Sequence, residues 1–183
     1  MPTFEQSKEL IKEKIHWFRK GTKDLPKPIP NYIHSWKVYE ALKTYGFDQD
    51  IQMAWLLHDI IEDGWMTLNE LRELWYSDDI LHLVDLATHD MTIDGSFEKR
   101  KKMLQRLIEE DNKDARAIKL ADISDNLLEC HLMPSKEKLE RFLNKKCPVF
   151  VYYGNKYFGG TEFYNEFLER YFKQVKAYNE YFI

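Results

Sequence analysis

The stretch WLLHDIIEDG, residues 55–64, decides the fold, because it sets polar side chains inside an otherwise apolar segment. The apolar members of the longer segment are Ile51, Met53, Ala54, Trp55, Leu56, Leu57, Ile60 and Ile61. They surround nearly every side of the helix that they would form, which predicts a buried helix. Burying His58, Asp59, Glu62 and Asp63 there is costly unless these groups are paired or bind a cation. We therefore expect this helix to carry a functional site.

The spacing of these four residues favours a shared pocket. His58 and Glu62 are four residues apart, as are Asp59 and Asp63. Residues four apart lie on one helix face, and the two pairs are separated by about 100° around the helix axis. All four side chains can therefore border one pocket.

A second apolar segment, residues 115–128, also carries polar residues at positions expected to be buried. Asp122 and Asn126 share one face of that helix. His34 falls in the first turn of a further predicted helix, from which it could point toward the buried helix. Imidazole and carboxylate groups without thiolates suit a divalent ion such as Mn, Fe, Zn or Mg. Such an ion lowers the pKa of bound water, so the pattern indicates hydrolysis.

Composition limits the class of protein. The 183 residues, 44% of them hydrophobic, suffice for one domain with a substantial core. The net charge of −4 argues against a nucleic-acid binder. Two cysteines without CxxC spacing predict no disulfide framework and favour a reducing, cytoplasmic setting. No apolar window approaches the about 20 residues of a membrane span, so we expect no membrane partner.

Helical patterns extend along most of the chain. Thr3 with Gln6 and Thr67 with Glu70 have the spacing of capping boxes, and Phe18 falls on the apolar face of the first helix. The expected helices span residues 3 to about 20, 34 to about 45, 51–63, 68–74, 78–88, 97 onward, 115–128, and a final amphipathic segment after residues 159–160. Residues 21–31 contain three prolines and predict an extended loop. FVYY, residues 150–153, is predicted as helix or loop because no second strand could pair with it. We predict an all-α, single-domain multi-helix bundle over residues 1–183, with a motif-bearing core at about 10–130 and a helical extension at about 131–183.

Several of these residues carry a resemblance to a known family. His34, the tandem His58-Asp59 and Asp122 reproduce the H…HD…D pattern of the HD phosphohydrolase superfamily. HDIIEDG (58–64) and IKLADISDNL (118–127) resemble the HDxxED and KLADxxxN blocks of the RelA/SpoT hydrolase domain and of stand-alone small alarmone hydrolases. LVDLATH (83–89) resembles the stretch before that family's basic helix. The resemblance covers residues 10–130 approximately and implies an HD-domain bundle.

The resemblance also implies a reaction and residue roles. The reaction would be metal-dependent removal of the 3'-pyrophosphate from (p)ppGpp, a small-molecule nucleotide. The ligands of one divalent ion, manganese first with iron, zinc or magnesium as alternatives, would be His34, His58, Asp59 and Asp122. Glu62 and Asp63 would orient or deprotonate the attacking water, and Asn126 would contact the sugar. The cations that meet the nucleotide would be Lys23 or Lys27 and Lys99, Arg100 or Lys102.

The sequence departs from the family where the substrate would bind. Residues 19–35 replace the shorter RKSGxPYxxHP-like loop, Ser35 stands where proline is common, and no match extends beyond residue 130. Three hypotheses therefore remain. The first is a (p)ppGpp hydrolase. The second is an HD hydrolase of another phosphorylated small molecule, such as a nucleoside 5'-monophosphate, and the third is a non-catalytic nucleotide-binding HD module.

Some of these groups also have purely structural interpretations. Glu62 and Asp63 could form salt bridges at a helix end, Asn126 could be a capping residue, and the basic run 99–102 could be a solvated face. The remaining histidines are predicted to be hydrogen-bonded core residues: His16, His82, His89 and His131. The aromatic C-terminal region is expected to pack in the core, and a homodimer surface there is left open.

Overall fold

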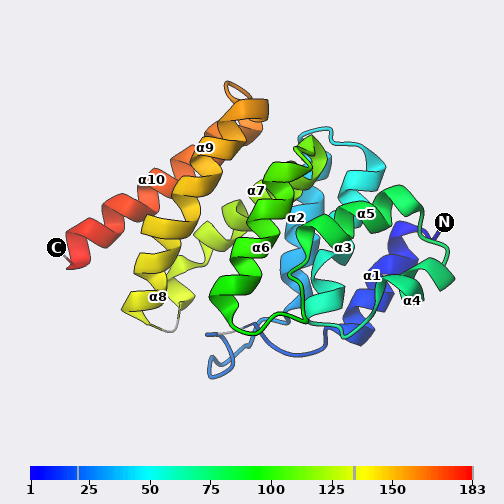
Figure 1. Cartoon of the computed structure of the whole chain (residues 1–183). Helices are drawn as coiled ribbons and strands as arrows, with labels where there is room; N and C mark the ends of the chain where they lie inside the picture. Colours follow the sequence, from blue (N-terminus) through cyan, green and yellow to red (C-terminus); the bar gives the residue numbers. More distant parts are fainter. Residues whose placement is uncertain (20, 134, 183) are drawn as a thin grey trace. The chain divides into compact units, whose positions relative to one another are not determined.

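Figure 1 shows the computed structural model of the chain, which describes residues 1–19, 21–133 and 135–182. The helices are α1 (Phe4–Lys14), α2 (Tyr32–Thr44), α3 (Gln49–Glu62), α4 (Leu68–Glu73), α5 (Asp78–Ala87), α6 (Ser96–Glu109), α7 (Lys113–Leu128), η1 (Cys130–Leu132), α8 (Lys136–Arg141), η2 (Phe142–Lys146), α9 (Cys147–Phe158) and α10 (Glu162–Phe182). The described residues form no β-strand. The all-α prediction is confirmed.

Contacts group the chain into two compact units, described separately below. The first contains residues 1–17 and 30–118, and the second contains residues 18–29 and 119–183. Helix α7 contributes residues to both units. The assignment of all 183 residues to one domain stays a prediction.

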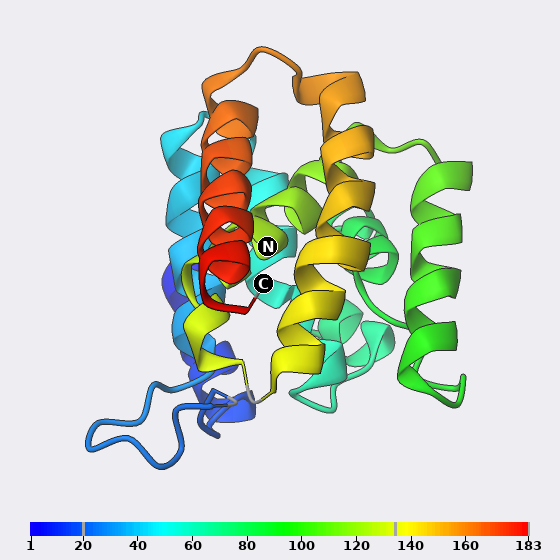
Figure 2. The same cartoon turned by 90° about the vertical axis from the view of Figure 1, so that its left-hand side faces the viewer.

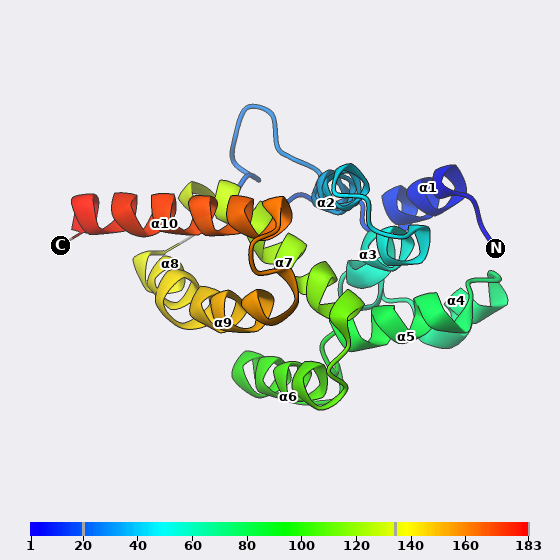
Figure 3. The ribbon, with the colours of Figure 1, turned by 90° about the horizontal axis from the view of Figure 1, so that it is seen from above.

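In the first unit, α3 is the central helix. Helices α1, α2 and α5 all pack against it, and α1 and α2 lie beside it in Figures 1 and 3. Its apolar residues face these neighbours, so Trp55, Leu56 and Ile60 are completely buried. Ile61 alone among the predicted apolar set remains partly exposed. A helix that is apolar on most sides is thus surrounded on most sides, as its sequence predicts.

Local capping explains where several helices begin. The Thr3 hydroxyl accepts the Gln6 N–H while the Gln6 side chain accepts the Thr3 N–H, and Thr67 and Glu70 form the same reciprocal pair ahead of α4. These capping boxes satisfy backbone donors that the first turn leaves without a partner. Helix α2 begins two residues before His34, which therefore occupies its first turn. These predicted helix starts are confirmed.

The first helix is shorter than its sequence pattern indicates. It ends at Lys14, and Phe18, which was expected on its apolar face, is 48% exposed. The Arg19 N–H donates to the Ile29 carbonyl at 2.8 Å, an extended pairing that helical backbone cannot make. Gly21 then has a φ of +87°, and a Cβ there would lie 2.0 Å from the Leu132 carbonyl oxygen. Pairing across the proline-rich loop ends the helix early, and residue 20 lies outside the described residues.

In the second unit, residues 136–158 form one continuous helical run with a π-helical turn at η2. Pro148 stands at the start of α9. A proline inside a helix lacks the N–H for the i−4 carbonyl and clashes with it, and a wider π turn relieves that conflict. FVYY lies within α9, so its assignment as non-strand is confirmed.

Helices α9 and α10 pack side by side, as Figures 1 and 2 both show. The Tyr164 hydroxyl donates to the Val151 carbonyl at 2.5 Å, and a Cβ at Gly154 would lie 2.9 Å from the Tyr164 ring. Buried aromatic residues include Phe158, Phe163, Tyr164 and Phe167. Core packing is therefore confirmed for these aromatics, whereas Tyr152 and Tyr181 remain largely exposed.

Candidate active site

His34, His58 and Asp59 gather in the first unit, where their ligand atoms all lie within 4.8 Å of one another. His34 comes from α2 and the other two come from α3. The histidines are 3% and 1% exposed, respectively, whereas Asp59 is partly exposed. His34, which is distant in sequence, thus meets the adjacent residues His58 and Asp59. The carboxylate is the most exposed of the three predicted ligands.

The orientation of the His58 ring follows from its hydrogen bonds. Its Nδ1 lies 2.7 Å from the carbonyl oxygen of Trp55. A carbonyl can only accept, so Nδ1 carries the hydrogen. Nε2 lies 2.8 Å from Oδ1 of Asp59. The backbone carbonyl thus engages Nδ1, which leaves Nε2, beside the carboxylate, as the ring nitrogen available to a cation.

The donor set fits a divalent metal ion. Two ligand atoms bound at right angles, each about 2.1 Å from an ion, are about 3 Å apart. The Nε2 to Oδ1 distance of 2.8 Å is close to that separation. Two imidazoles and a carboxylate also match the preferences of manganese, iron and zinc. The residues present are therefore suited to hold such an ion.

Trp55 supports both histidines. Its ring stacks on His58, with centroids 3.7 Å apart, and meets the His34 ring edge-on at 5.7 Å. Its indole N–H donates to the carbonyl of Ser35 at 3.0 Å, on the residue next to His34. The indole is completely buried. A rigid aromatic wall therefore limits the rotation of both imidazole rings.

Glu62 ends α3, and one of its carboxylate oxygens contacts two nitrogens of His89. The backbone N–H of His89 donates to Oε1 at 2.6 Å, and Nδ1 of the same histidine lies 2.7 Å from Oε1. His89 follows the C-terminal end of α5, one residue after Thr88. The Glu62 carboxylate is therefore held by a segment outside its own helix.

Asp63 caps the C-terminus of α3 and is also held from another segment. The Asn31 side-chain amide, immediately before α2, donates to Asp63 Oδ2 at 2.9 Å. The two acids have no basic residue in the last turn of α3 to balance them. A carboxylate at a helix C-terminus is disfavoured by the helix dipole, so these outside donors help to stabilise the pair.

Asp122 lies on α7 in the second unit, buried and engaged with its own neighbours. The Lys119 ammonium lies 3.1 Å from its Oδ2, and the Asn126 amide donates to its Oδ1 at 2.5 Å. Arg19 donates to the Asn126 Oδ1 at 2.8 Å and also pairs with Glu129. The shared helix face predicted for Asp122 and Asn126 is thus expressed as a direct bond. Both the oxygen and the nitrogen of the Asn126 side-chain amide are therefore hydrogen-bonded within this network.

The cations proposed for the substrate lie in two segments. Lys23 and Lys27 are exposed on the proline-rich loop, in the second unit. Lys99 and Arg100 are half-buried on α6, in the first unit, and Lys102 is exposed there. The basic run on α6 is therefore only partly a solvated face.

Thiol chemistry plays no part in this site. Cys130 and Cys147 are both buried, and burial raises the pKa of each thiol to about 12. A thiolate is the form of cysteine that binds metals or attacks substrates. Both groups are therefore protonated near neutral pH, in agreement with a ligand set of nitrogen and oxygen.

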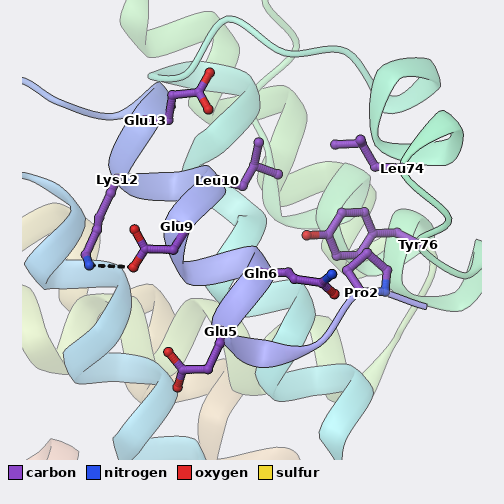
Figure 4. Close-up of a pocket in the computed structure, with 9 residues that line it drawn as sticks. All are labelled: Pro2, Glu5, Gln6, Glu9, Leu10, Lys12, Glu13, Leu74 and Tyr76. Atoms are coloured by element: carbon purple, nitrogen blue, oxygen red, sulfur yellow. Dashed lines mark hydrogen bonds and ion pairs between the residues drawn. The ribbon is translucent and has the colours of Figure 1, made fainter.

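A large groove lies elsewhere on the first unit, along α1 (Figure 4). It has a volume of about 930 Å³ and is lined by Pro2, Glu5, Gln6, Glu9, Leu10, Lys12, Glu13, Leu74 and Tyr76. Lys12 is paired with Glu9 at 2.6 Å. The groove includes none of the residues predicted to bind metal or substrate or to take part in catalysis, and it offers no histidine. Its chemistry is not that of the candidate active site.

Sequence reasoning missed two residues that hold the acidic pair, Asn31 and His89. His89 was expected to be a core histidine, and it is instead a partly exposed partner of Glu62. The core prediction is wrong for His16, His82 and His131, which are all exposed. The position of His89 at the end of the LVDLATH block was the available signal. For Asn31 the sequence contains no comparable signal.

Comparisons with known proteins support the fold. No family model matches the chain, and no curated protein matches it. A solved structure that is similar belongs to a metazoan ortholog of SpoT, described as hydrolysing ppGpp and playing a role in starvation responses. The TM-score is 0.76 at 22% sequence identity, and the match covers 96% of this chain and 97% of the other. The likeness to SpoT-type hydrolases expected from the motifs is confirmed at the level of the fold.

Proposed function

We propose that this protein is a metal-dependent phosphohydrolase that removes the 3'-pyrophosphate from (p)ppGpp. The observation that carries the proposal is the cluster of His34, His58 and Asp59, with ligand atoms within 4.8 Å. Two of these residues lie on α3, which ends at the acidic pair Glu62 and Asp63, in a chain that shares its fold with a ppGpp hydrolase. A nucleotide with two pyrophosphate groups is a substrate for which such a cation site is suited.

The metal site would be formed by His34, His58 and Asp59, with Asp122 as the fourth ligand and manganese as the ion. Support for Asp122 comes from the H…HD…D pattern and from its buried carboxylate. When bound, a divalent ion lowers the pKa of water and offsets negative charge on the phosphate. The His58 hydrogen bond to the Trp55 carbonyl keeps Nε2 available as the ligand atom.

The protein groups would divide the remaining work. Water attacks the phosphorus that carries the ribose 3'-oxygen, and Glu62 accepts the proton that the water loses, with Asp63 orienting the water. The bond from phosphorus to the 3'-oxygen breaks, and that oxygen takes a proton from solvent. Lys99 and Arg100 would attract the phosphates, Lys23 or Lys27 the base side of the nucleotide, and Asn126 its sugar.

The first test is pyrophosphate release from ppGpp by metal-free protein, with and without added manganese. We expect release only with manganese, and loss of release when a chelator is added, because the water needs the cation to lose a proton near neutral pH. The measurement is the initial rate of pyrophosphate formation with GDP as the second product. Release at the same rate without any divalent ion would contradict the metal-dependent mechanism.

A substitution of Asp122 tests the fourth ligand. Asp122→Asn removes the charge but keeps an oxygen facing Lys119, so the second unit retains more of its bonding than with alanine. We expect manganese affinity to fall by about tenfold or more, measured by calorimetry alongside the melting temperature. Unchanged affinity in a folded variant would exclude Asp122 from the ligand set.

The unusual proline-rich loop favours a second candidate, hydrolysis of another nucleotide. Residues 19–35 differ from the family's short loop, and the Asn126 amide is already bonded to Arg19 and Asp122. A panel of nucleoside 5'-monophosphates assayed beside ppGpp separates the candidates. Turnover of a monophosphate without turnover of ppGpp would favour the second one. Metal binding with no turnover of any nucleotide would favour a non-catalytic binding module.

Across the described residues, none of the helices has both the length and the hydrophobicity that crossing a bilayer requires. A cytoplasmic location, the absence of nucleic-acid binding and a homodimer stay predictions.

A further inference from the structure

We propose that His89 is a positioning residue that holds the carboxylate of Glu62 in place for proton transfer. The inference rests on the proposed function for the role of Glu62, but the contact itself is independent of the substrate. Two nitrogens of one residue, the backbone N–H that donates at 2.6 Å and the ring Nδ1 at 2.7 Å, contact the same oxygen, Oε1. A pair of donors on one oxygen restrains both the distance and the direction of a carboxylate.

The segment that presents His89 is itself anchored to α3. Thr88 caps the end of α5, and its hydroxyl lies 2.7 Å from the Val84 carbonyl and 3.2 Å from the His58 carbonyl. His89 then reaches Glu62, four residues after His58 and so one turn further along α3. Two consecutive residues therefore bond to successive turns of the helix that carries the candidate site. Thr88 is buried, which keeps the segment from moving independently.

Glu62 needs this support because of where it lies. It is the last residue of α3, and Asp63 follows it as the C-cap. The end of a helix frays, and its dipole disfavours negative charge there. With no basic residue in the last turn of α3, the contacts from His89 help to keep the carboxylate ordered. An ionised carboxylate is the form that can accept a proton from water.

The imidazole supplies one of the donors, and this makes the role testable. Because Glu62 can only accept through its ionised carboxylate, Nδ1 of His89 carries the hydrogen. Asparagine places its Nδ2 at the same point along the side chain as Nδ1 of histidine. His89→Asn thus keeps the side-chain donor, whereas His89→Ala leaves only the backbone N–H. The two variants separate loss of the donor from loss of the native residue.

The activity test compares these variants with His82→Ala, which removes an exposed histidine from the same segment of the chain. We expect His89→Ala to lower kcat by about 10–100-fold while KM and manganese affinity change little. His89→Asn should recover most of the lost kcat, and His82→Ala should match the wild type. A wild-type kcat in His89→Ala would overturn the proposal, as would equal losses in His89→Ala and His89→Asn.

A second measurement does not depend on turnover. The His89 backbone N–H has the Glu62 carboxylate as its acceptor, so hydrogen exchange at this amide reports the contact directly. We expect Glu62→Ala to speed exchange at the His89 amide by about tenfold or more, and Glu62→Gln to preserve its protection. Equal exchange in wild type and Glu62→Ala would overturn the contact. If wild-type protein releases no pyrophosphate from ppGpp while this exchange result holds, the proposed substrate fails and the positioning contact stands.

Discussion

Replacement of Asp59 with alanine is expected to abolish both metal retention and pyrophosphate release. Asp59 is the carboxylate of the three-residue cluster and faces His58 Nε2 at 2.8 Å. Without it, the two imidazoles and the proposed fourth ligand Asp122 must hold the ion, and the site loses one of the two carboxylates that a divalent cation prefers. We expect manganese affinity to fall by more than the about 10–100-fold that loss of a supporting residue costs. Metal content after dialysis and the rate of pyrophosphate release measure the two effects.

A matched control removes an aspartate that has no part in the cluster. Asp79 is exposed in the first turn of α5, so Asp79→Ala should retain metal and activity. The melting temperature of Asp59→Ala should stay near that of the metal-free wild type, because Asp59 is partly exposed and adds no core packing. Full metal content in folded Asp59→Ala would show that the cluster is not the metal site.

Replacement of Glu62 with glutamine is expected to give a protein that binds metal but turns over slowly. Glutamine keeps an oxygen that can accept the hydrogen bond from the His89 N–H and face its Nδ1, so the geometry at the end of α3 should persist. It has no basic carboxylate, and loss of a general base costs about 10²–10⁴-fold in rate. We therefore expect kcat to fall in that range with unchanged manganese affinity. Steady-state kinetics and calorimetry on the same sample make the comparison.

The control for this variant is Glu73→Gln, at an exposed position on α4. It changes the net charge by the same amount and should leave kcat unchanged. If Glu62→Gln turned over at the wild-type rate, Glu62 would not be the proton acceptor. If it lost metal instead, the acid would belong with the ligands rather than with the proton transfer.

The helices show which features follow from local sequence. The buried helix α3 and the capping boxes at Thr3 and Thr67 depend on residues within about one or two turns of each other, and all were predicted. The end of α1 was not. It is decided by the pairing of Arg19 with Ile29 and by the approach of Gly21 to Leu132, which sequence periodicity cannot reveal. Non-local pairing overrides helix propensity at this boundary.

The candidate site divides in the same way. The sequence by itself determined which side chains can bind a metal and how they are arranged on α3. Helical spacing alone places His58 above Glu62 and Asp59 above Asp63. Only the tertiary structure decided what holds the acids, since His89 and Asn31 lie 27 and 32 residues away along the chain. Those contacts arise from how α5 and the segment before α2 pack against α3. Side-chain spacing within one helix cannot specify them, because they depend on which faces of separate helices meet.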